Sequence, residues 1–193
     1  MAFSVIYDAC VLYPASLRDL LVRLAMTGIY QARWTDQILE EMVEGILDDR
    51  PDLTRLQLDR TVSLMNAAVR DCRVVDYEPL IAGLELPDPD DCHVMAAAIK
   101  SGAQVIVTNN LKDFPAERLD TWGIEAQTPE AFALHALDIS EARVIAAIQQ
   151  QADALKNPPQ SVAQLLGRLR KNGLVSFAAT VADLLGVTPV DDE

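Results

Sequence analysis

Short apolar runs alternate with stretches of helical periodicity through most of the chain, and this alternation limits the folds open to it. Residues 3–7 are apolar almost throughout, which is typical of a strand covered on both faces. Residues 104–108 form a second run of this kind. Parallel strands separated by helices require right-handed crossovers. The sequence therefore predicts an α/β fold with a mostly parallel central sheet flanked by helices.

Local patterns predict the other elements of this α/β part. The apolar residues after Thr35 recur at helical spacing as far as Leu47, and Thr35 is a favoured N-cap residue. We expect further helices over residues 17–25, 51–71 and 92–101 and from Pro129 onward, and further short strands over residues 31–34, 73–77 and 123–126.

The pattern becomes purely helical from about residue 139. Helices are expected over residues 140–155, 161–171 and 174–185, separated by segments rich in Asn, Pro and Gly. This tail carries no motif with evident chemistry. We therefore expect an α/β domain over residues 1–137 and an all-helical C-terminal extension over residues 138–193.

The net charge of −13 argues against a protein that coats nucleic acid, because binding to a phosphate backbone normally needs a basic face. It leaves a nuclease open, since a bound metal offsets part of an acidic site. The three cysteines have no metal-ligand spacing and are expected to be free thiols. With no signal-like or bilayer-length apolar segment, we expect a soluble cytoplasmic protein without a membrane partner.

Four acidic residues stand where strand and helix ends should bring them together. Asp8 closes the first apolar run, Asp113 follows the run at 104–108, Asp91 precedes a helix and Glu41 lies on one. Ligands of parallel sheets gather at the carboxyl ends of the strands. At an effective dielectric near 20, two carboxylates about 4 Å apart repel by roughly 4 kcal/mol. Such a cluster is suited to a hard divalent metal and to phosphate chemistry.

Each position also has a purely structural explanation. Asp8 can end a strand in an Asx-turn, and Asp88 can cap a helix whose first residue is Pro89. Only one of the neighbours Glu40 and Glu41 can face inward. Asn109 and Asn110 suit a simple turn, although a turn alone leaves the flanking Thr108 and Asp113 unexplained.

Four short motifs resemble those of the PIN-domain family, and notably of the VapC-type toxin ribonucleases. They occur in the family's order over roughly residues 3–135, and the helical tail is similar to an extension found in some of these toxins. The motifs are Val5-Ile6-Tyr7-Asp8-Ala9-Cys10-Val11-Leu12, Thr35-Asp36-Gln37-Ile38-Leu39-Glu40-Glu41-Met42, Asp88-Pro89-Asp90-Asp91-Cys92-His93-Val94-Met95 with the following alanines, and Val107-Thr108-Asn109-Asn110-Leu111-Lys112-Asp113-Phe114.

The resemblance implies a PIN-like fold and a Mg²⁺- or Mn²⁺-dependent endoribonuclease, the toxin of a type II toxin–antitoxin pair, that leaves 5′-phosphate and 3′-hydroxyl ends. It implies an RNA substrate and an antitoxin protein as partners, and many family members are homodimers. By position, Asp8, Asp91 and Asp113 correspond to metal-binding acids, and these three together with Glu41 to the catalytic set. Glu41 fits the family pattern better than Glu40.

The polar residues of the fourth motif correspond to substrate-binding positions. Thr108 matches the family's polar residue at the end of the fourth strand. Asn110 is an amide where the family often has an acid, so either its carbonyl oxygen ligates the metal or Asp113 supplies the charge. This departure keeps open a second hypothesis, a degenerate PIN-like module that binds RNA or protein without catalysis.

A haloacid-dehalogenase-type phosphatase receives less support. Such a phosphatase also begins with a strand ending in Asp, but it needs a second Asp where this chain has Cys10. Neither His93 nor His135 is assigned a catalytic role. Basic residues are candidates for holding the RNA backbone, namely Arg18, Arg23, Arg33, Arg168, Arg170 and Lys171.

Overall fold

A computed structural model describes residues 3–190 and divides the chain into two compact units, each built from two chain segments. The first unit contains residues 3–13 and 30–128, and the second contains residues 14–29 and 129–190. The grouping of residues 14–29 with the C-terminal helices was not anticipated from the sequence. The division of the chain at residues 137 and 138 stays a prediction about its domains.

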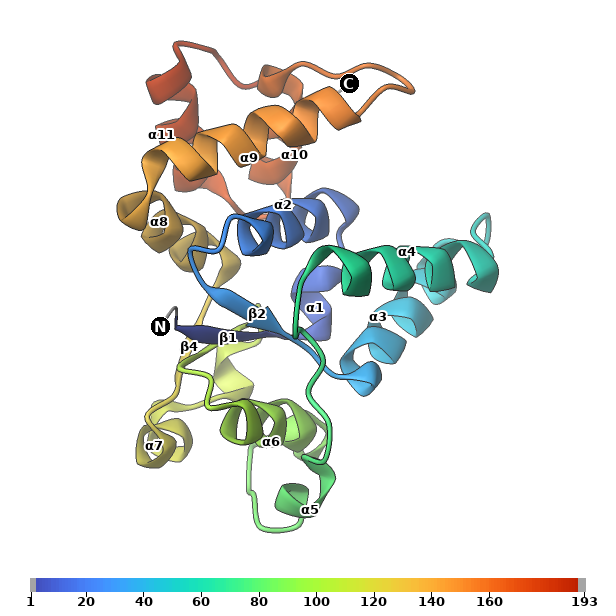
Figure 1. Ribbon diagram of the computed structural model, residues 1–193, viewed down its shortest axis with the longest axis vertical. Coiled ribbons are helices and arrows are strands. Elements are labelled where there is room, and N and C mark those ends of the chain that lie inside the picture. Colours follow the sequence, from blue (N-terminus) through green and yellow to red (C-terminus); the bar gives the residue numbers. More distant parts are fainter. Residues whose placement is uncertain (1–2, 191–193) are drawn as a thin grey trace. The chain divides into compact units, whose positions relative to one another are not determined.

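The first unit is built around a four-stranded sheet in the order β2-β1-β3-β4, with every pair parallel (Figure 1). The predicted α/β fold with a parallel sheet is confirmed. β1 places Tyr7 opposite Val107 of β3, so these two central strands end side by side. The strands are β1 (Ser4–Tyr7), β2 (Gln31–Arg33), β3 (Val105–Val107) and β4 (Glu125–Gln127).

Helices cover both sides of this sheet. α6 packs on β1 and β3 from one side, while α1 lies on the other side and contacts α3 (Figure 1). Every residue of β1 and of β3 is buried, as expected for strands covered on both faces. The α-helices of the first unit are α1 (Ala9–Leu12), α3 (Asp36–Asp49), α4 (Arg55–Ala68), α5 (Glu78–Ile81), α6 (Cys92–Ser101) and α7 (Ala116–Leu119).

Three short 3₁₀ helices, η1 (Pro89–Asp91), η2 (Leu111–Asp113) and η3 (Asp120–Trp122), complete the first unit. η1 runs directly into α6, and η2 follows the loop after β3. Asp88 accepts a hydrogen bond from the backbone N–H of Asp90 at 3.0 Å, so it caps η1 as its position before Pro89 predicts.

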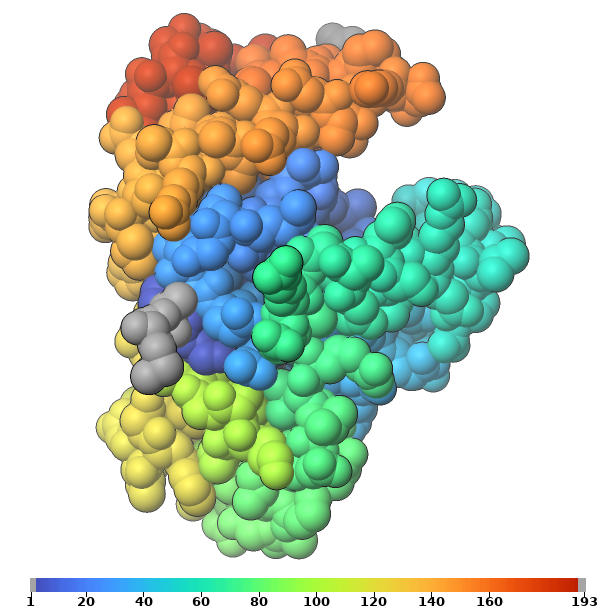
Figure 2. Space-filling view, viewed as in Figure 1, coloured from blue at the N-terminus to red at the C-terminus, as the bar shows by residue number. Residues whose placement is uncertain are grey.

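Capping residues set where the helices of the α3–α4 pair begin. The Thr35 hydroxyl accepts the backbone N–H of Ile38 at 3.0 Å and starts α3, as predicted. Thr54 forms a capping box with Gln57, so α4 begins later than the predicted residue 51. α4 buries Leu58 and Met65 and leaves most of its surface exposed (Figure 2).

The predicted strand over residues 73–77 is wrong. Within the described chain this segment forms only an isolated bridge, between Trp34 and Arg73. Asp76 has a φ of +57°, a left-handed conformation that ends an extended run, and Val75 is exposed. The alternation of apolar residues there reflects a loop that buries Cys72, Val74 and Tyr77.

The second unit is entirely helical and its core is apolar. α2 packs against α9 and α10, and α11 packs against α8 and α10. The helices expected over residues 17–25, 140–155, 161–171 and 174–185 and from Pro129 onward are confirmed to within a few residues. They are α2 (Ala15–Met26), α8 (Pro129–Ile139), α9 (Glu141–Ala154), α10 (Val162–Lys171) and α11 (Val175–Leu185).

Helix length and apolar content also bear on membrane insertion. Among the helices of residues 3–190, none combines the length and the hydrophobicity that crossing a bilayer requires.

Candidate active site

The site is built at the point where β1 and β3 end. The backbone N–H of Asp8 donates to the carbonyl of Val107 at 3.1 Å, which continues the strand pairing by one residue. Asp8 and Thr108 thereby become neighbours although they lie 100 positions apart in the sequence. Both side chains are buried, with exposed fractions of 4% and 0%.

A compact hydrogen-bond network holds the Asp8 carboxylate. Its Oδ2 accepts the Thr108 hydroxyl at 2.6 Å and the Cys10 thiol at 3.1 Å. The Cys10 sulfur accepts the backbone N–H of Asn109 at 3.2 Å, which ties the loop after β3 to the start of α1. Burial, and next the charge of Asp8, raise the pKa of Cys10 to about 12, so the thiol keeps its proton and remains a donor.

Only one oxygen of Asp8 is used in this way. Oδ1 of Asp8 has no hydrogen-bond or ion-pair partner among residues 3–190. A carboxylate with one oxygen fixed by donors and the other open is prepared to bind a further group without losing side-chain freedom.

Asp91 and Asp113 complete a cluster of like charges with Asp8. Burial raises the pKa of Asp91 to about 6, and the charges of Asp8, Asp88 and Asp113 add to the increase. A weaker, opposite contribution comes from His93. The carboxylates of Asp8 and Asp113 therefore lie within electrostatic range of Asp91, although the three come from different chain segments.

The loop after β3 positions Asp113 and Asn110. The backbone N–H of Asn110 donates to the Thr108 hydroxyl at 2.9 Å, and the N–H of Asp113 donates to the Asn110 carbonyl at 2.9 Å. Asp113 is 9% exposed and lies 3.8 Å from the ammonium of Lys112, while Asn110 is exposed. Thr108, predicted to bind substrate, is fully buried and contacts Asp8 and this loop.

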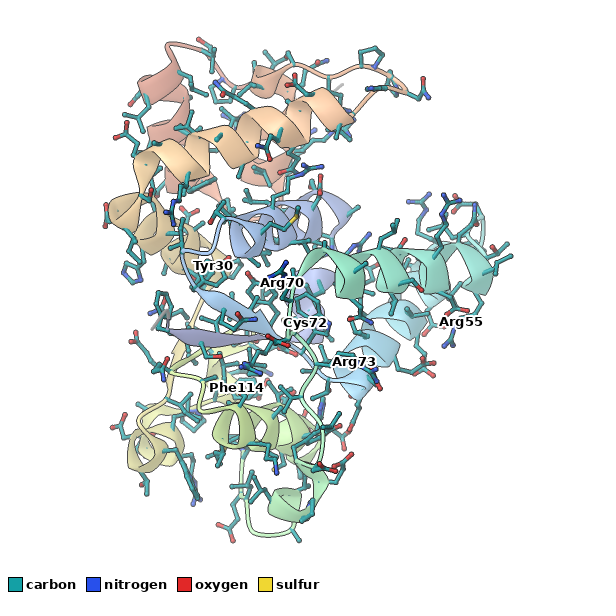
Figure 3. The ribbon with its side chains drawn as sticks, viewed as in Figure 1. Tyr30, Arg55, Arg70, Cys72, Arg73 and Phe114 are labelled. Atoms are coloured by element: carbon teal, nitrogen blue, oxygen red, sulfur yellow. The ribbon has the colours of Figure 1, made fainter. Side chains whose placement is uncertain are left out.

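The neighbouring acids Glu40 and Glu41 face different surroundings. Glu40 forms a two-pronged ion pair, at 2.7 and 2.6 Å, with Arg55 of α4, which is labelled in Figure 3. Glu41 Oε1 instead lies 3.0 Å from Nε2 of His93, on α6, and accepts the side-chain amide of Gln37 at 3.1 Å. Glu41 also lines an open hollow together with Ala9, Cys10, Tyr13 and Met42. Glu41 thus faces the same hollow as Cys10, whose thiol donates to Asp8.

The donor set fits a hard divalent cation that keeps several of its waters. It offers carboxylate oxygens, one of which is the open Oδ1 of Asp8. A positive charge would relieve the repulsion between the carboxylates. Within residues 3–190, no group of three or more Asp, Glu, His or Cys side chains is placed closely enough to hold a metal ion. Mg²⁺ is commonly bound through one or two carboxylates, with water and phosphate oxygens as its other ligands, so this open arrangement is compatible with it.

Sequence reasoning missed two residues of the site, Cys10 and His93. Cys10 was read only as a free thiol, and His93 was assigned no role. The available signal was position, because each stands two residues after a candidate metal-binding acid. Of the basic candidates, Arg33 donates to the Ser4 hydroxyl and the Asp71 carbonyl, whereas Arg18 and Arg23 belong to the second unit.

The first unit is an α/β domain with acidic residues at the ends of its central parallel strands, and comparison with known families gives it a name. A family model described as PIN domain matches residues 4–112, more than half of the chain, so the chain belongs to the PIN-domain family. A second model, described as VapC50 C-terminal domain, matches residues 129–183. The chain is thus a VapC-type PIN protein with a C-terminal extension, as its motifs predict.

One curated relative is a protein of Mycobacterium tuberculosis (strain ATCC 25618 / H37Rv) named "Putative ribonuclease VapC50". It is 41% identical to this chain over 103 residues, which cover 53% of this chain and 60% of the relative. The chain thus spans somewhat less than two thirds of that relative's length. No solved structure matches the chain.

Proposed function

We propose that this chain is a Mg²⁺- or Mn²⁺-dependent endoribonuclease, the toxin of a type II toxin–antitoxin pair. The observation that carries the proposal is the gathering of Asp8, Asp91 and Asp113 beside two parallel strand ends, with the pKa of Asp91 raised to about 6. Folding brings these carboxylates together against their mutual repulsion. Such crowding of like charges is typical of sites that bind a cation. The name of the Mycobacterium tuberculosis relative supports RNA as the substrate.

A divalent cation held by Asp8, Asp91 and Asp113 would lower the pKa of a coordinated water and screen the charge of the scissile phosphate. Asp8 contributes its open Oδ1, while Thr108 and Cys10 hold Oδ2 in place. Thr108 therefore acts through Asp8, and the exposed side chain of Asn110 is the candidate for contact with RNA.

Glu41 supplies the base. Its Oε1 accepts hydrogen bonds, whereas Oε2 has no partner among the described residues and the side chain is 39% exposed. Oε2 can thus orient the attacking water and accept its proton while the oxygen attacks phosphorus in line with the leaving 3′-oxygen. That 3′-oxygen takes up a proton as it leaves, and the products are a 5′-phosphate and a 3′-hydroxyl.

The proposed protein partner is a cognate antitoxin. With a net charge of −13 and an acidic site, the chain favours a partner segment with an Arg or Lys that enters the site and replaces the metal's charge. The pair would act in the cytoplasm, where its RNA substrates are. A small gene directly upstream that encodes a DNA-binding protein is the first evidence to seek.

The test is cleavage of structured RNAs by the purified chain with Mg²⁺ or Mn²⁺. Asp8→Asn and Asp91→Asn should each lower the cleavage rate by at least about 100-fold, because even outer-shell changes at metal sites cost 10–100-fold. Asp120→Asn is the matched control, since Asp120 is an exposed acid of the same unit on η3. Chelation should abolish cleavage by the wild type.

The alternative is a PIN-like module that binds RNA or protein without catalysis. The observation favouring it is the amide of Asn110 where the family often has an acid. Wild-type protein that binds the RNAs but shows no metal-dependent cleavage would establish this alternative and exclude the ribonuclease.

A further inference from the structure

A buried histidine adjoins the acidic site and has no part in the mechanism above. His93 lies in the first turn of α6, two residues after Asp91, and is 4% exposed. Its Nε2 is 3.0 Å from Oε1 of Glu41, on α3. Because the imidazole is buried, it reaches the site only through the side chains that it touches.

The second ring nitrogen of His93 indicates which nitrogen carries the proton in this contact. Nδ1 of His93 is buried and has no hydrogen-bond partner among residues 3–190. A proton on Nδ1 would bury an unpaired N–H donor, whereas a proton on Nε2 leaves only an unpaired lone pair at Nδ1. The favoured tautomer therefore carries its hydrogen on Nε2 and donates it to Glu41.

Glu41 is held from a second side by its own helix. Gln37 donates its amide to the same Oε1 at 3.1 Å, and the Tyr77 hydroxyl donates to the Gln37 carbonyl oxygen at 3.3 Å. Two donors, one from α3 and one from α6, thus converge on Oε1. Together they fix the rotamer of the Glu41 side chain, and with it the position of Oε2. A half-exposed glutamate without such partners would sample several rotamers.

We propose that His93 is a positioning residue, which fixes the Glu41 carboxylate by donating from Nε2 to Oε1 and so presents Oε2 to the attacking water. The inference rests on the proposed function, in which Glu41 is the base. It assigns no contact with RNA or metal to His93. Its physical basis is preorganisation, since a base already held in the productive rotamer need not be ordered during the reaction.

Two substitutions separate this hydrogen bond from the packing of the ring. His93→Gln places an amide N–H close to the position of Nε2, and His93→Leu fills similar space without a donor. His93→Leu should lower kcat by about 10–100-fold with KM nearly unchanged, as expected for loss of an outer-shell partner. His93→Gln should recover most of that loss. Equal loss in both variants, with both folded, would overturn the proposal.

The coupling to Glu41 is tested in a double-mutant cycle. If His93 acts through Glu41, His93→Leu should cause no further loss of kcat in the Glu41→Gln background. The same fold-loss in both backgrounds would mean that His93 acts by another route. Circular dichroism of each variant checks that the fold is retained.

A third measurement requires neither RNA cleavage nor a substitution at His93. In ¹⁵N-edited NMR of the wild type, the Nε2–H of His93 should give a slowly exchanging imidazole signal that Glu41→Ala shifts or abolishes. His135→Gln assigns the signal, because His93 and His135 are the two histidines of the chain. An unchanged His93 signal in Glu41→Ala overturns the positioning role, whereas an inactive wild type with the expected NMR response overturns only the proposed ribonuclease function.

Discussion

The two units of the chain bury different kinds of polar group. In the first unit Asp8, Asp91 and Asp113 gather as like charges, and the pKa of Asp91 rises to about 6. In the second unit the one buried polar residue among those described is a neutral amide, Gln151. Gln151 is 1% exposed and donates to the Ser16 carbonyl at 2.8 Å, and Asn172 donates to the Ser16 hydroxyl at 2.7 Å.

The difference separates groups that stabilise the fold from groups that work against it. A neutral amide donating to a carbonyl contributes about 1 kcal/mol and carries no charge that needs a counter-ion. Gathered carboxylates destabilise the folded chain until a cation or a proton arrives, and such local cost is typical of functional sites. Polar burial alone therefore does not locate the site; unbalanced charge does.

The largest expected effect tests whether the two units are energetically separate. Phe177 is fully buried in the second unit, so Phe177→Ala should lower the free energy of unfolding there by about 3–5 kcal/mol. Both tryptophans, Trp34 and Trp122, belong to the first unit. In urea titrations the circular dichroism midpoint should move much more than the fluorescence midpoint. Val175→Ala, at an exposed position, is the control, and equal shifts of both midpoints would show one cooperative body.

The next effect compares one hydroxyl from each unit. Thr108→Val removes the donor to Asp8 Oδ2 and should weaken Mn²⁺ binding by about 10–100-fold, measured by water-proton relaxation. Ser16→Ala removes the acceptor for Asn172, should cost about 1 kcal/mol of stability and should leave Mn²⁺ binding unchanged. Thr121→Val, exposed in the first unit, is a further control. Unchanged metal affinity in Thr108→Val would remove Thr108 from the site.

A smaller effect follows from the raised pKa of Asp91. The ionised form of Asp91 is disfavoured in the folded chain. The resulting loss of stability is absent below pH 3.8, the ordinary pKa, and complete above about pH 6. In metal-free buffer, Asp91→Asn should therefore gain stability relative to wild type as pH rises from 4 to 7. Because Asp91 is partly exposed, solvent screening limits this gain to about 1 kcal/mol. Urea midpoints at each pH measure it, and a pH-independent difference would contradict the proposed charge crowding.

The smallest effect concerns the ion pair between Glu40 and Arg55. Both side chains are substantially exposed, with fractions of 43% and 51%. Exposed pairs contribute little to stability, so Arg55→Ala should leave the melting temperature and the cleavage rate close to those of wild type. A large loss of cleavage would assign Glu40, rather than Glu41, to the chemistry.

The sequence predicts much of this fold because the relevant signals are local. The apolar run before Asp8, the Thr35 cap and the periodicity of the C-terminal helices each depend on neighbouring residues, and all three recur in the structure. The failure at residues 73–77 is also local in origin, since a left-handed residue such as Asp76 leaves no mark on the apolar pattern.

The site is less predictable because its contacts join distant positions. Asp8 meets Thr108 across 100 residues, and Glu41 meets His93 through the packing of two helices. A single sequence gives candidates for such contacts but not their partners. For this reason the sequence predicts the four acids and Thr108 as site residues, whereas the roles of Cys10 and His93 follow only from three-dimensional contacts.

The chain passes between its two units three times, after residues 13, 29 and 128. No single cut can therefore release either unit intact. A fragment ending at residue 128 keeps α2 but loses α9 and α10, its partners, and so bares Leu17, Leu20, Leu21 and Leu24 to water. Fragments shortened in this way should aggregate and be poorly soluble. Loss of activity in such a fragment would therefore not be evidence about catalysis.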